Sequence, residues 1–344
     1  MADAGERGGP EAGLARGRET TGYEALLAGD RAALGAALSV VEDGGEDSHR
    51  LLDRLRGRDA SAQIIGVTGP PGSGKSTLVN ELAVRYADQG RRVAIVAVDP
   101  TSPYTGGAVL GDRVRMNRAS RHPGVFIRSA ATRGLLGGVA RATLDFVRTF
   151  EAVGYDPIIV ETVGIGQSEV DIARIAHTAI VVEAPGLGDA VQAMKAGVLE
   201  IASVLCVNKA DLPGADAKLL QMNELADRAT AYAPDWRIPV VATVASTGHG
   251  VDDLMVAIAS HREHLGSTDR IRAIERVRAL AEIRAALEAL RVDAPLGRAE
   301  RAGRLEDLAN AVAARTISAR DAAASVDREF AAAAYPEGRG DERA

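Results

Sequence analysis

The sequence predicts an α/β fold built on a mostly parallel β-sheet. Short runs rich in valine and isoleucine recur between residues 61 and 262, and stretches with helical spacing separate them. Strands that alternate with helices form βαβ units, whose strands run parallel. Several runs are apolar throughout, as in strands that helices cover on both faces. The candidate strands are residues 64–68, 93–98, 125–128, 158–161, 179–183, 204–208 and 240–244.

A glycine-rich loop follows the first of these strands and precedes a helix that continues from Thr77. Such a turn directs backbone N–H groups at one point, where the helix N-terminus adds partial positive charge. In this pattern Lys75 reaches the β- and γ-phosphates, and the Ser76 hydroxyl ligates Mg²⁺. The flanking strand and helix disfavour a chance match, so we expect a nucleoside triphosphate to bind here. The loop consists of Gly69, Pro70, Pro71, Gly72, Ser73, Gly74, Lys75 and Ser76.

Composition excludes several classes of protein. The net charge of −6 argues against nucleic acid as the main partner, because counterion release needs clustered Lys and Arg. No segment approaches the ~18 consecutive apolar residues of a membrane span. The first 20 residues lack the apolar core of a signal peptide, and we expect a disordered lead-in. Cys206 is the only cysteine and lies in an apolar run, which predicts a reduced core thiol. These features predict a cytoplasmic protein.

A candidate base-recognition motif, Asn208-Lys209-Ala210-Asp211, follows the sixth candidate strand. A carboxylate here can accept hydrogen bonds from both N1–H and the N2 amino group of guanine, and adenine offers no such pair. A site built for those bonds rejects the wrong base, because its buried acceptor would be left unpaired. Alone, the tetrapeptide also suits an ordinary strand-to-loop turn. Its place after another strand of the same sheet favours guanine recognition, and hence GTP over ATP.

The next strand ends at Val244, Ala245 and Ser246, where GTPases place a loop that supports the guanine. Such loops usually carry Ser before the Ala, and this chain has Val244 instead.

A third polar element ends the fourth candidate strand, at Glu161. An acidic residue in that position can hold Mg²⁺ directly or through water, although most GTPases place Asp there. Gly164 leaves room for a backbone N–H to approach the γ-phosphate, so this loop can respond to hydrolysis.

Two further carboxylates and one arginine are candidates for the same site. Asp99 and Asp112 can join the Mg²⁺ ligands, and Arg115 can stabilise charge in the transition state of phosphoryl transfer. Each has a plainer alternative. Asp99 suits a cap before Pro100, Asp112 a solvated loop paired with a nearby arginine, and Arg115 an ordinary surface position.

Helical patterns flank the predicted sheet on both sides. Residues 23–57 contain helical segments with a break at 44–47. Beyond residue 265 a long amphipathic helix is predicted, which 295–297 ends, and two shorter helices follow at 305–312 and 322–326. The narrow apolar seam of the long helix favours pairing with a second chain over packing against its own domain. The seam consists of Ile271, Ile274, Val277, Leu280, Ile283, Leu287 and Leu290.

These patterns divide the chain into regions. We expect a lead-in over 1–20, a helical N-terminal region over 21–60 and a nucleotide-binding domain over 61–264. A helical C-terminal arm follows over 265–335, and a frayed tail over 336–344.

Together the motifs resemble the MeaB/ArgK family of GTPases associated with methylmalonyl-CoA mutase. The resemblance covers roughly residues 23–330, nearly the whole ordered chain. It is carried by GVTGPPGSGKST, VDPTSPYTGGAVLGDRVRM, FIRSAATRGLLGGVA, VETVGIGQSE, PGLGDAVQAMKAG and NKAD.

The resemblance implies a G domain of the P-loop class, a helical N-terminal region and a C-terminal arm that forms a homodimer. It also implies a chaperone that gates cofactor delivery to an adenosylcobalamin-dependent acyl-CoA mutase and protects that enzyme. The family's magnesium and nucleotide positions fall on Ser76, Asp99, Asp112 and Glu161, with Lys75 on the phosphates. A family loop that transmits the nucleotide state to the mutase matches residues 183–197, although an ordinary surface loop is the plainer alternative. Its polar positions fall on Asp189, Gln192 and Lys195.

We therefore expect a regulatory GTPase that is slow alone and faster when bound to its mutase. Lys75, Arg115 and Gly164 are the candidate catalytic positions, and the phosphate-binding loop contains no arginine finger. Two other classes are less well supported. A nickel metallochaperone usually carries a Cys or His motif, whereas this chain has one Cys and six scattered His. A small-molecule kinase would need an acceptor pocket and a lid.

Overall fold

The structure is a computed structural model that describes residues 22–58, 61–100, 117–132, 141–162, 175–187, 202–232 and 235–331. The chain forms two compact units, and the division between them falls between Val277 and Arg278.

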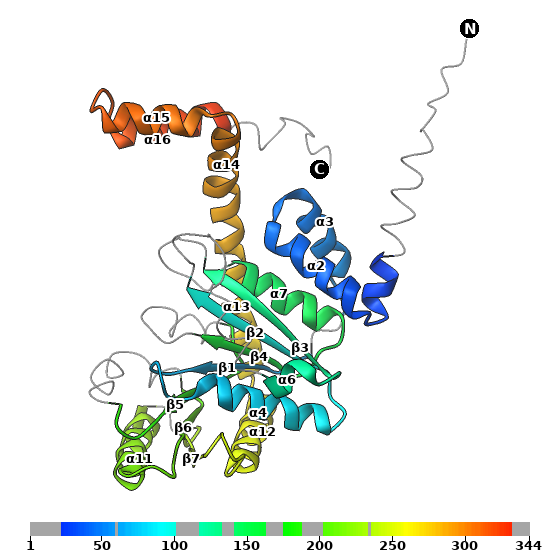
Figure 1. The fold of residues 1–344 in the computed structure, drawn as a ribbon, viewed down its shortest axis with the longest axis vertical. Helices are drawn as coiled ribbons and strands as arrows, with labels where there is room; N and C mark the ends of the chain where they lie inside the picture. The colour runs from blue at the N-terminus through cyan, green and yellow to red at the C-terminus, as the bar shows by residue number, and fades with distance from the viewer. Residues whose placement is uncertain are drawn as a thin grey trace. The chain divides into compact units, whose positions relative to one another are not determined.

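The first unit contains a sheet of seven parallel strands within the described residues, in the order β3-β2-β4-β1-β5-β6-β7 (Figure 1). All seven predicted strands are confirmed, and β1 lies in the middle of the sheet between β4 and β5. The carboxyl ends of parallel strands meet at one edge, so the loops that follow them share that edge. The strands are β1 (Ile64–Thr68), β2 (Val93–Pro100), β3 (Val125–Thr132), β4 (Ile158–Thr162), β5 (Thr178–Glu183), β6 (Val204–Val207) and β7 (Val240–Ala242).

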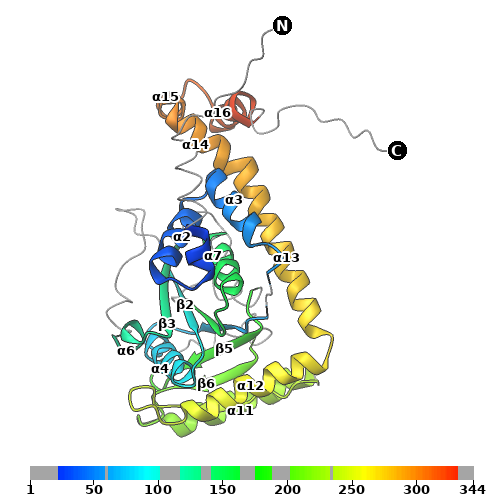
Figure 2. The same cartoon turned by 90° about the vertical axis from the view of Figure 1, so that its right-hand side faces the viewer.

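Helices cover both faces of this sheet, as the continuous apolar strands predict. Side chains alternate along β5, so Val182 packs in one core and Val181 in another. The core around Val182 contains residues of α4 (Lys75–Asp88), α6 (Asn117–Arg121) and α12 (Val251–Ser267). The core around Val181 contains residues of α11 (Ala215–Tyr232). Figure 2 shows α7 (Arg141–Ala152) across the strands from α4.

The N-terminal helices α2 (Arg31–Asp43) and α3 (Gly45–Leu55) pack on α7. Arg31 holds α2 to the chain before β3 by donating to the carbonyl oxygens of Pro123 (2.9 Å) and Val125 (2.8 Å). The predicted break over 44–47 was too long, since only Gly44 separates the two helices. Glu46 and Asp47 instead form the first turn of α3, where acidic side chains favour the positive end of the helix dipole.

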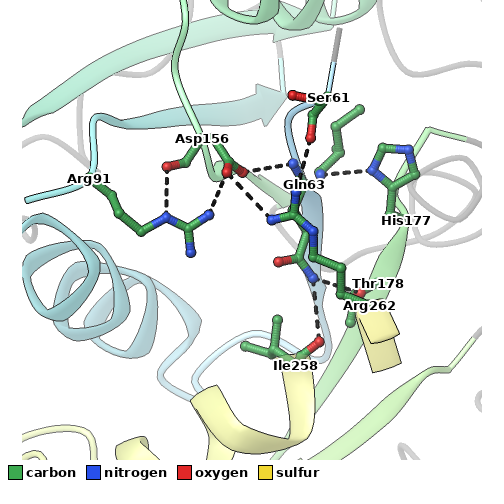
Figure 3. Close-up of polar contacts among 9 residues, drawn as sticks. Ser61, Gln63, Arg91, Asp156, His177, Thr178, Ile258 and Arg262 are labelled. Atoms are coloured by element: carbon green, nitrogen blue, oxygen red, sulfur yellow. Dashed lines mark hydrogen bonds and ion pairs between the residues drawn. The ribbon is translucent and has the colours of Figure 1, made fainter. Parts of the chain in front are cut away.

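A cluster of polar contacts joins the amino ends of the strands, at the edge opposite the phosphate-binding loop (Figure 3). Asp156 accepts from the Gln63 N–H (2.8 Å) and from the Arg91 guanidinium (2.6 Å). Burial by itself would raise the pKa of Asp156, but these two hydrogen bonds and the nearby Arg262 outweigh it and hold that pKa below its usual range. Arg262 of α12 also donates to the Ser61 carbonyl (3.0 Å). The cluster therefore fastens α12 to the starts of β1 and β4.

Helix α13 (Arg270–Glu288) contains the division between the two units. Of the predicted apolar seam, Ile274 is half-buried and the others are exposed: Ile271, Val277, Leu280, Ile283, Leu287 and Leu290.

The second unit continues through short helices with a small core of their own, which includes Leu308 and Val326. The prediction that 295–297 ends the helical run was wrong, because Pro295 and Gly297 lie in α14. Pro295 lies just after the π-helical segment η1, so its missing backbone N–H falls where the regular α-helical hydrogen bonding is already interrupted. The elements are η1 (Ala289–Asp293), α14 (Ala294–Arg301), α15 (Arg304–Ala313), α16 (Ala319–Val326) and η2 (Asp327–Ala331).

No helix in the described part of the chain is both long enough and apolar enough to cross a membrane.

Candidate functional site

The phosphate-binding loop joins β1 to α4 at the carboxyl edge of the sheet. The Lys75 ammonium donates to the carbonyl oxygens of Gly69 (2.8 Å) and Pro70 (3.0 Å). The side chain is largely buried, with 7% exposed. The lysine is therefore held against the loop, and the positive end of α4 lies beside it.

Gly74 caps α4 with a left-handed backbone, at a φ of 89°. A Cβ atom at this position would lie 2.3 Å from Nδ2 of Asn208, so no other residue fits without displacing that amide. Asn208 Nδ2 in turn donates to the Ser73 carbonyl (2.9 Å). The glycine thus lets the phosphate-binding loop approach the base-recognition motif.

Asn208 connects three segments of the site. Besides its bond to Ser73, its Oδ1 accepts from the Ala245 N–H (3.0 Å) and from the Thr243 hydroxyl (3.2 Å). Its side chain is buried and uses both its donor and its acceptor. A single amide therefore fixes the phosphate-binding loop against the turn after β7.

Lys209 lies over the phosphate-binding loop, where its ammonium donates to the Gly72 carbonyl (2.7 Å). Its backbone has a φ of 56°. A positive φ is uncommon for a residue other than glycine, and residues with such strained backbones cluster at functional sites. Asp211 follows with an exposed side chain.

The turn after β7, residues 244–248, contains the predicted base-supporting residues and is called the base-side turn below. Its ends pair as a bridge between Val244 and His249, and the Gly248 N–H donates to the Val244 carbonyl (2.9 Å). Ala245 is buried and Ser246 is exposed. Val244, where related loops carry Ser, is buried and contributes its backbone to the turn.

Ser76 and Glu161 meet at the carboxyl ends of β1 and β4. The Ser76 hydroxyl donates to Oε1 of Glu161 (2.7 Å), and Glu161 is buried, with 2% exposed. Hydroxyl and carboxylate oxygens are the hard ligands that Mg²⁺ prefers, so this part of the site fits Mg²⁺. No group of three or more His, Cys, Asp and Glu side chains that could hold a metal occurs within the described ranges.

Several predicted site residues lie outside the described residues. The backbone of Asp99 is described near the end of β2, where it pairs with Ala131, but its side chain is not. The structure does bring Lys75, Ser76, Glu161, Asn208 and Lys209 to one edge of the sheet. The predicted positions outside the described ranges are Asp112, Arg115, Gly164, Asp189, Gln192 and Lys195.

Thr243, which donates to the side chain of Asn208, was not predicted from the sequence. Its signal was a hydroxyl residue in the run Val240–Val244, which is otherwise apolar. Arg85, on the third turn of α4, donates to the Gly248 carbonyl and was not predicted either, because no spacing in the sequence marks a charged residue on a helix.

Comparison with known proteins decides the family. A model described as methylmalonyl Co-A mutase-associated GTPase MeaB matches residues 34–295. The chain belongs to this family.

Relatives support the assignment to the MeaB family. A protein of Pyrococcus abyssi, with GTPase in its name, is 47% identical over 251 residues, covering 72% of this chain and 78% of the relative. GTPase ArgK of Escherichia coli is 35% identical over 257 residues, covering 72% and 77%. The crystal structure of an LAO/AO transport system kinase matches with a TM-score of 0.65 at 24% identity, covering 90% of this chain and 96% of that one. That structure supports the fold alone, and the sequence relatives identify a MeaB-family GTPase.

Proposed function

We propose that this GTPase binds GTP at the carboxyl edge of its sheet and serves as a chaperone of an adenosylcobalamin-dependent acyl-CoA mutase of the methylmalonyl-CoA mutase type. In that role it gates loading of the cofactor and protects the mutase. The main support for the nucleotide-binding part of this proposal is the buried side-chain amide of Asn208, which joins the phosphate-binding loop to the base-side turn. The mutase half depends on the family, whose description names that association.

The proposed nucleotide site divides into a phosphate side and a base side. Backbone N–H groups of residues 69–77 surround the phosphates, and the Lys75 ammonium moves from loop carbonyls to phosphate oxygens. The Asp211 carboxylate accepts from the guanine edge, and residues 244–246 support the ring. The exchange at Lys75 is favourable because an anionic acceptor binds an ammonium more strongly than a neutral carbonyl does.

Ser76 and Glu161 are the described residues that would hold Mg²⁺, with Asp99 and Asp112 as further ligands. The ion would supply neutralisation of charge on the phosphates. Arg115 adds positive charge, and Gly164 offers a backbone N–H to the γ-phosphate. Without an arginine finger in the phosphate-binding loop, hydrolysis is slow alone and is stimulated by the mutase. Asp189, Gln192 and Lys195 transmit the nucleotide state to that partner.

We propose that the chain has three regions: a helical region over 21–60, a G domain over 61–264 and a dimerisation arm over 265–335. We also propose that the protein is cytoplasmic.

The exposed apolar side chains of α13 support dimerisation, since pairing would remove that seam from water. Light scattering at micromolar concentration tests it: a dimer is expected, and Ile283→Glu should give a monomer. A monomeric wild-type protein would remove the dimer from the proposal.

Calorimetry with Mg²⁺ tests the nucleotide half. We expect heat on adding GDP or GTP and none on adding ADP or ATP. Equal turnover of ATP and GTP would contradict guanine recognition.

A pull-down from the native host tests the proposed association with a mutase. With a non-hydrolysable GTP analogue it should capture an acyl-CoA mutase, and that mutase should accelerate phosphate release. Capture of no mutase, with or without the analogue, would contradict the chaperone role.

A further inference from the structure

Helix α4 begins at Lys75, and two charged residues further along it, Glu81 and Arg85, belong to no nucleotide-binding motif. Glu81 and Arg85 lie one turn apart on this helix, and Glu81 Oε1 pairs with Arg85 Nε (3.4 Å). The Glu81 residue is 9% exposed, which is low for a carboxylate. A charge in such a position needs partners that hold it.

Arg85 reaches from α4 to the base-side turn. Its Nη2 donates to the Gly248 carbonyl (2.8 Å), and its Nη1 pairs with Asp252 in the first turn of α12. Gly248 has a φ of 77°, and a Cβ there would lie 2.5 Å from Arg85 Nη2. The guanidinium therefore packs directly against the turn and leaves no room for a side chain at position 248.

The turn is also bonded to the NKAD motif, where the Ala245 N–H donates to Asn208. Asn208, which follows β6, and Arg85 of α4 thus hold the turn at two points, Ala245 and Gly248. The planar guanidinium bonds Asp252 through Nη1 and Gly248 through Nη2, in a fixed geometry that an ammonium, with its single nitrogen, does not reproduce.

Glu81 is itself fixed from a third element. Arg118 of α6 donates to Glu81 Oε2 (2.7 Å), and the neighbouring Asn80 accepts from the Ala119 N–H (2.9 Å). The two oxygens of Glu81 thus serve two arginines, and the carboxylate cannot turn away from Arg85 without leaving Arg118.

We propose that Arg85 is a positioning residue for guanine binding, which sets the place of the base-side turn, and that Glu81 acts through it. The inference depends on the proposed function, because it concerns the affinity for the same guanine nucleotide. Arg85 contacts Gly248, Asp252 and Glu81, none of which belongs to the phosphate-binding loop. Its loss should therefore weaken nucleotide binding while leaving the chemical step intact, which separates it from Lys75 on the same helix.

The experiment compares Arg85→Met, which keeps the aliphatic stem, with Arg228→Met, an exposed arginine on α11. Losing a hydrogen bond from a charged donor should raise the Kd for GDP about tenfold, and the KM for GTP similarly. The kcat at saturating GTP should stay within about twofold of wild type, since uniform binding alone is lost. Arg228→Met should match wild type in all three.

Two further variants keep the test decisive if Arg85→Met folds poorly. Arg85→Lys retains the charge but not the fork, and should weaken GDP binding by about threefold. Glu81→Gln should weaken it by a similar factor, of about three, and add nothing in the Arg85→Met background, because Glu81 acts through Arg85. GDP binding by Arg85→Lys as tight as that of wild type, or a fall in kcat at unchanged KM, would overturn the inference. Absence of GDP binding by the wild-type protein would instead overturn the proposed function.

Discussion

At the amino edge of the sheet, Asp156 accepts from the Arg91 guanidinium, so an anion and a cation compensate each other (Figure 3). At the carboxyl edge, Lys75 and Lys209 donate to backbone carbonyls of the phosphate-binding loop. A neutral carbonyl is a weaker acceptor than an anion. The two lysines can therefore exchange these contacts for a stronger one with an anion such as phosphate, whereas the Asp156–Arg91 pair has no stronger partner to gain.

We therefore expect residues at one edge of the sheet to affect mainly nucleotide binding and residues at the other to affect mainly stability. Substitutions at the carboxyl edge should change nucleotide binding and hydrolysis with little change in the free energy of unfolding. Substitutions at the amino edge should do the reverse. The comparison holds only if the two effects can be separated by experiment.

Lys75→Ala tests the carboxyl edge with the largest expected effect. Removing the ammonium deletes the positive charge nearest the proposed phosphates, and GTP hydrolysis should fall by at least ~100-fold. Phosphate release measures the rate, and Arg228→Ala is the control with an exposed cation removed. Hydrolysis within a few-fold of wild type would show that Lys75 is not part of the reaction.

Asp211→Asn tests the base side. The amide oxygen is a weaker acceptor than a carboxylate and its NH₂ opposes the guanine N2 amino group, so the Kd for GDP should rise about 30-fold. Xanthosine diphosphate, with a carbonyl at that position, should bind the variant better than GDP does.

Titration calorimetry measures both affinities for this variant. Asp216→Asn, an exposed residue in the first turn of α11, is the matched control. Unchanged GDP affinity in Asp211→Asn would exclude the assigned role.

The fold was largely predictable because its signals are local. Each strand is an apolar run. Because the glycine-rich loop lies between a strand and a helix, β1 and α4 could be predicted from it. Strand ends were less certain: β3 runs to Thr132, beyond the predicted 128, because its polar residues pair with β2 in register. Pro295 was misjudged because its effect depends on its position within a helix, which the sequence alone does not reveal.

The site was predictable only where a motif marks it. Asn208 and Lys75 belong to motifs whose spacing reflects the chemistry of a nucleotide. Arg85 and Glu81 belong to no motif, and their contacts join distant parts of the chain: Arg85 contacts Gly248, 163 positions away, and Glu81 contacts Arg118, 37 positions away. No periodicity records such contacts, since they depend on how helices lie across a sheet.

Asp156→Asn tests the amino edge, with a smaller expected effect. The neutral amide loses charge-assisted bonds from Arg91 and Gln63, but the carboxylate is 37% exposed, so solvent screens part of the interaction. We expect the free energy of unfolding to fall by about 1.5 kcal/mol, with the Kd for GDP unchanged.

Urea unfolding followed by circular dichroism measures this change. Asp253→Asn, an exposed residue in the first turn of α12, should leave stability near that of wild type. A loss of GDP affinity together with stability would show that the two edges are not separable.

His261 gives the amino edge a pH dependence, with the smallest expected effect. Its Nδ1 lies 3.0 Å from the Thr178 hydroxyl at the start of β5, and its ring packs against Trp236. Burial, followed by the nearby charges of His264, Arg270 and His177, lowers the pKa of His261 to about 4. An unfolded chain has a histidine pKa of about 6.5, so between these values it binds more protons than the folded chain does.

Stability should therefore rise with pH across this window and fall on acidification. Between pH 7.5 and 5.5 we expect His261 to account for a loss of about 1 kcal/mol. Urea unfolding at each pH, followed by the fluorescence of Trp236, the only tryptophan, measures the slope. His261→Gln removes the titrating group and should flatten the slope by that amount, while His49→Gln, on the exposed face of α3, should not. Equal slopes in wild type and His261→Gln would mean that the folded protein accommodates a protonated His261, and the amino edge would then be less closed to water than its contacts indicate.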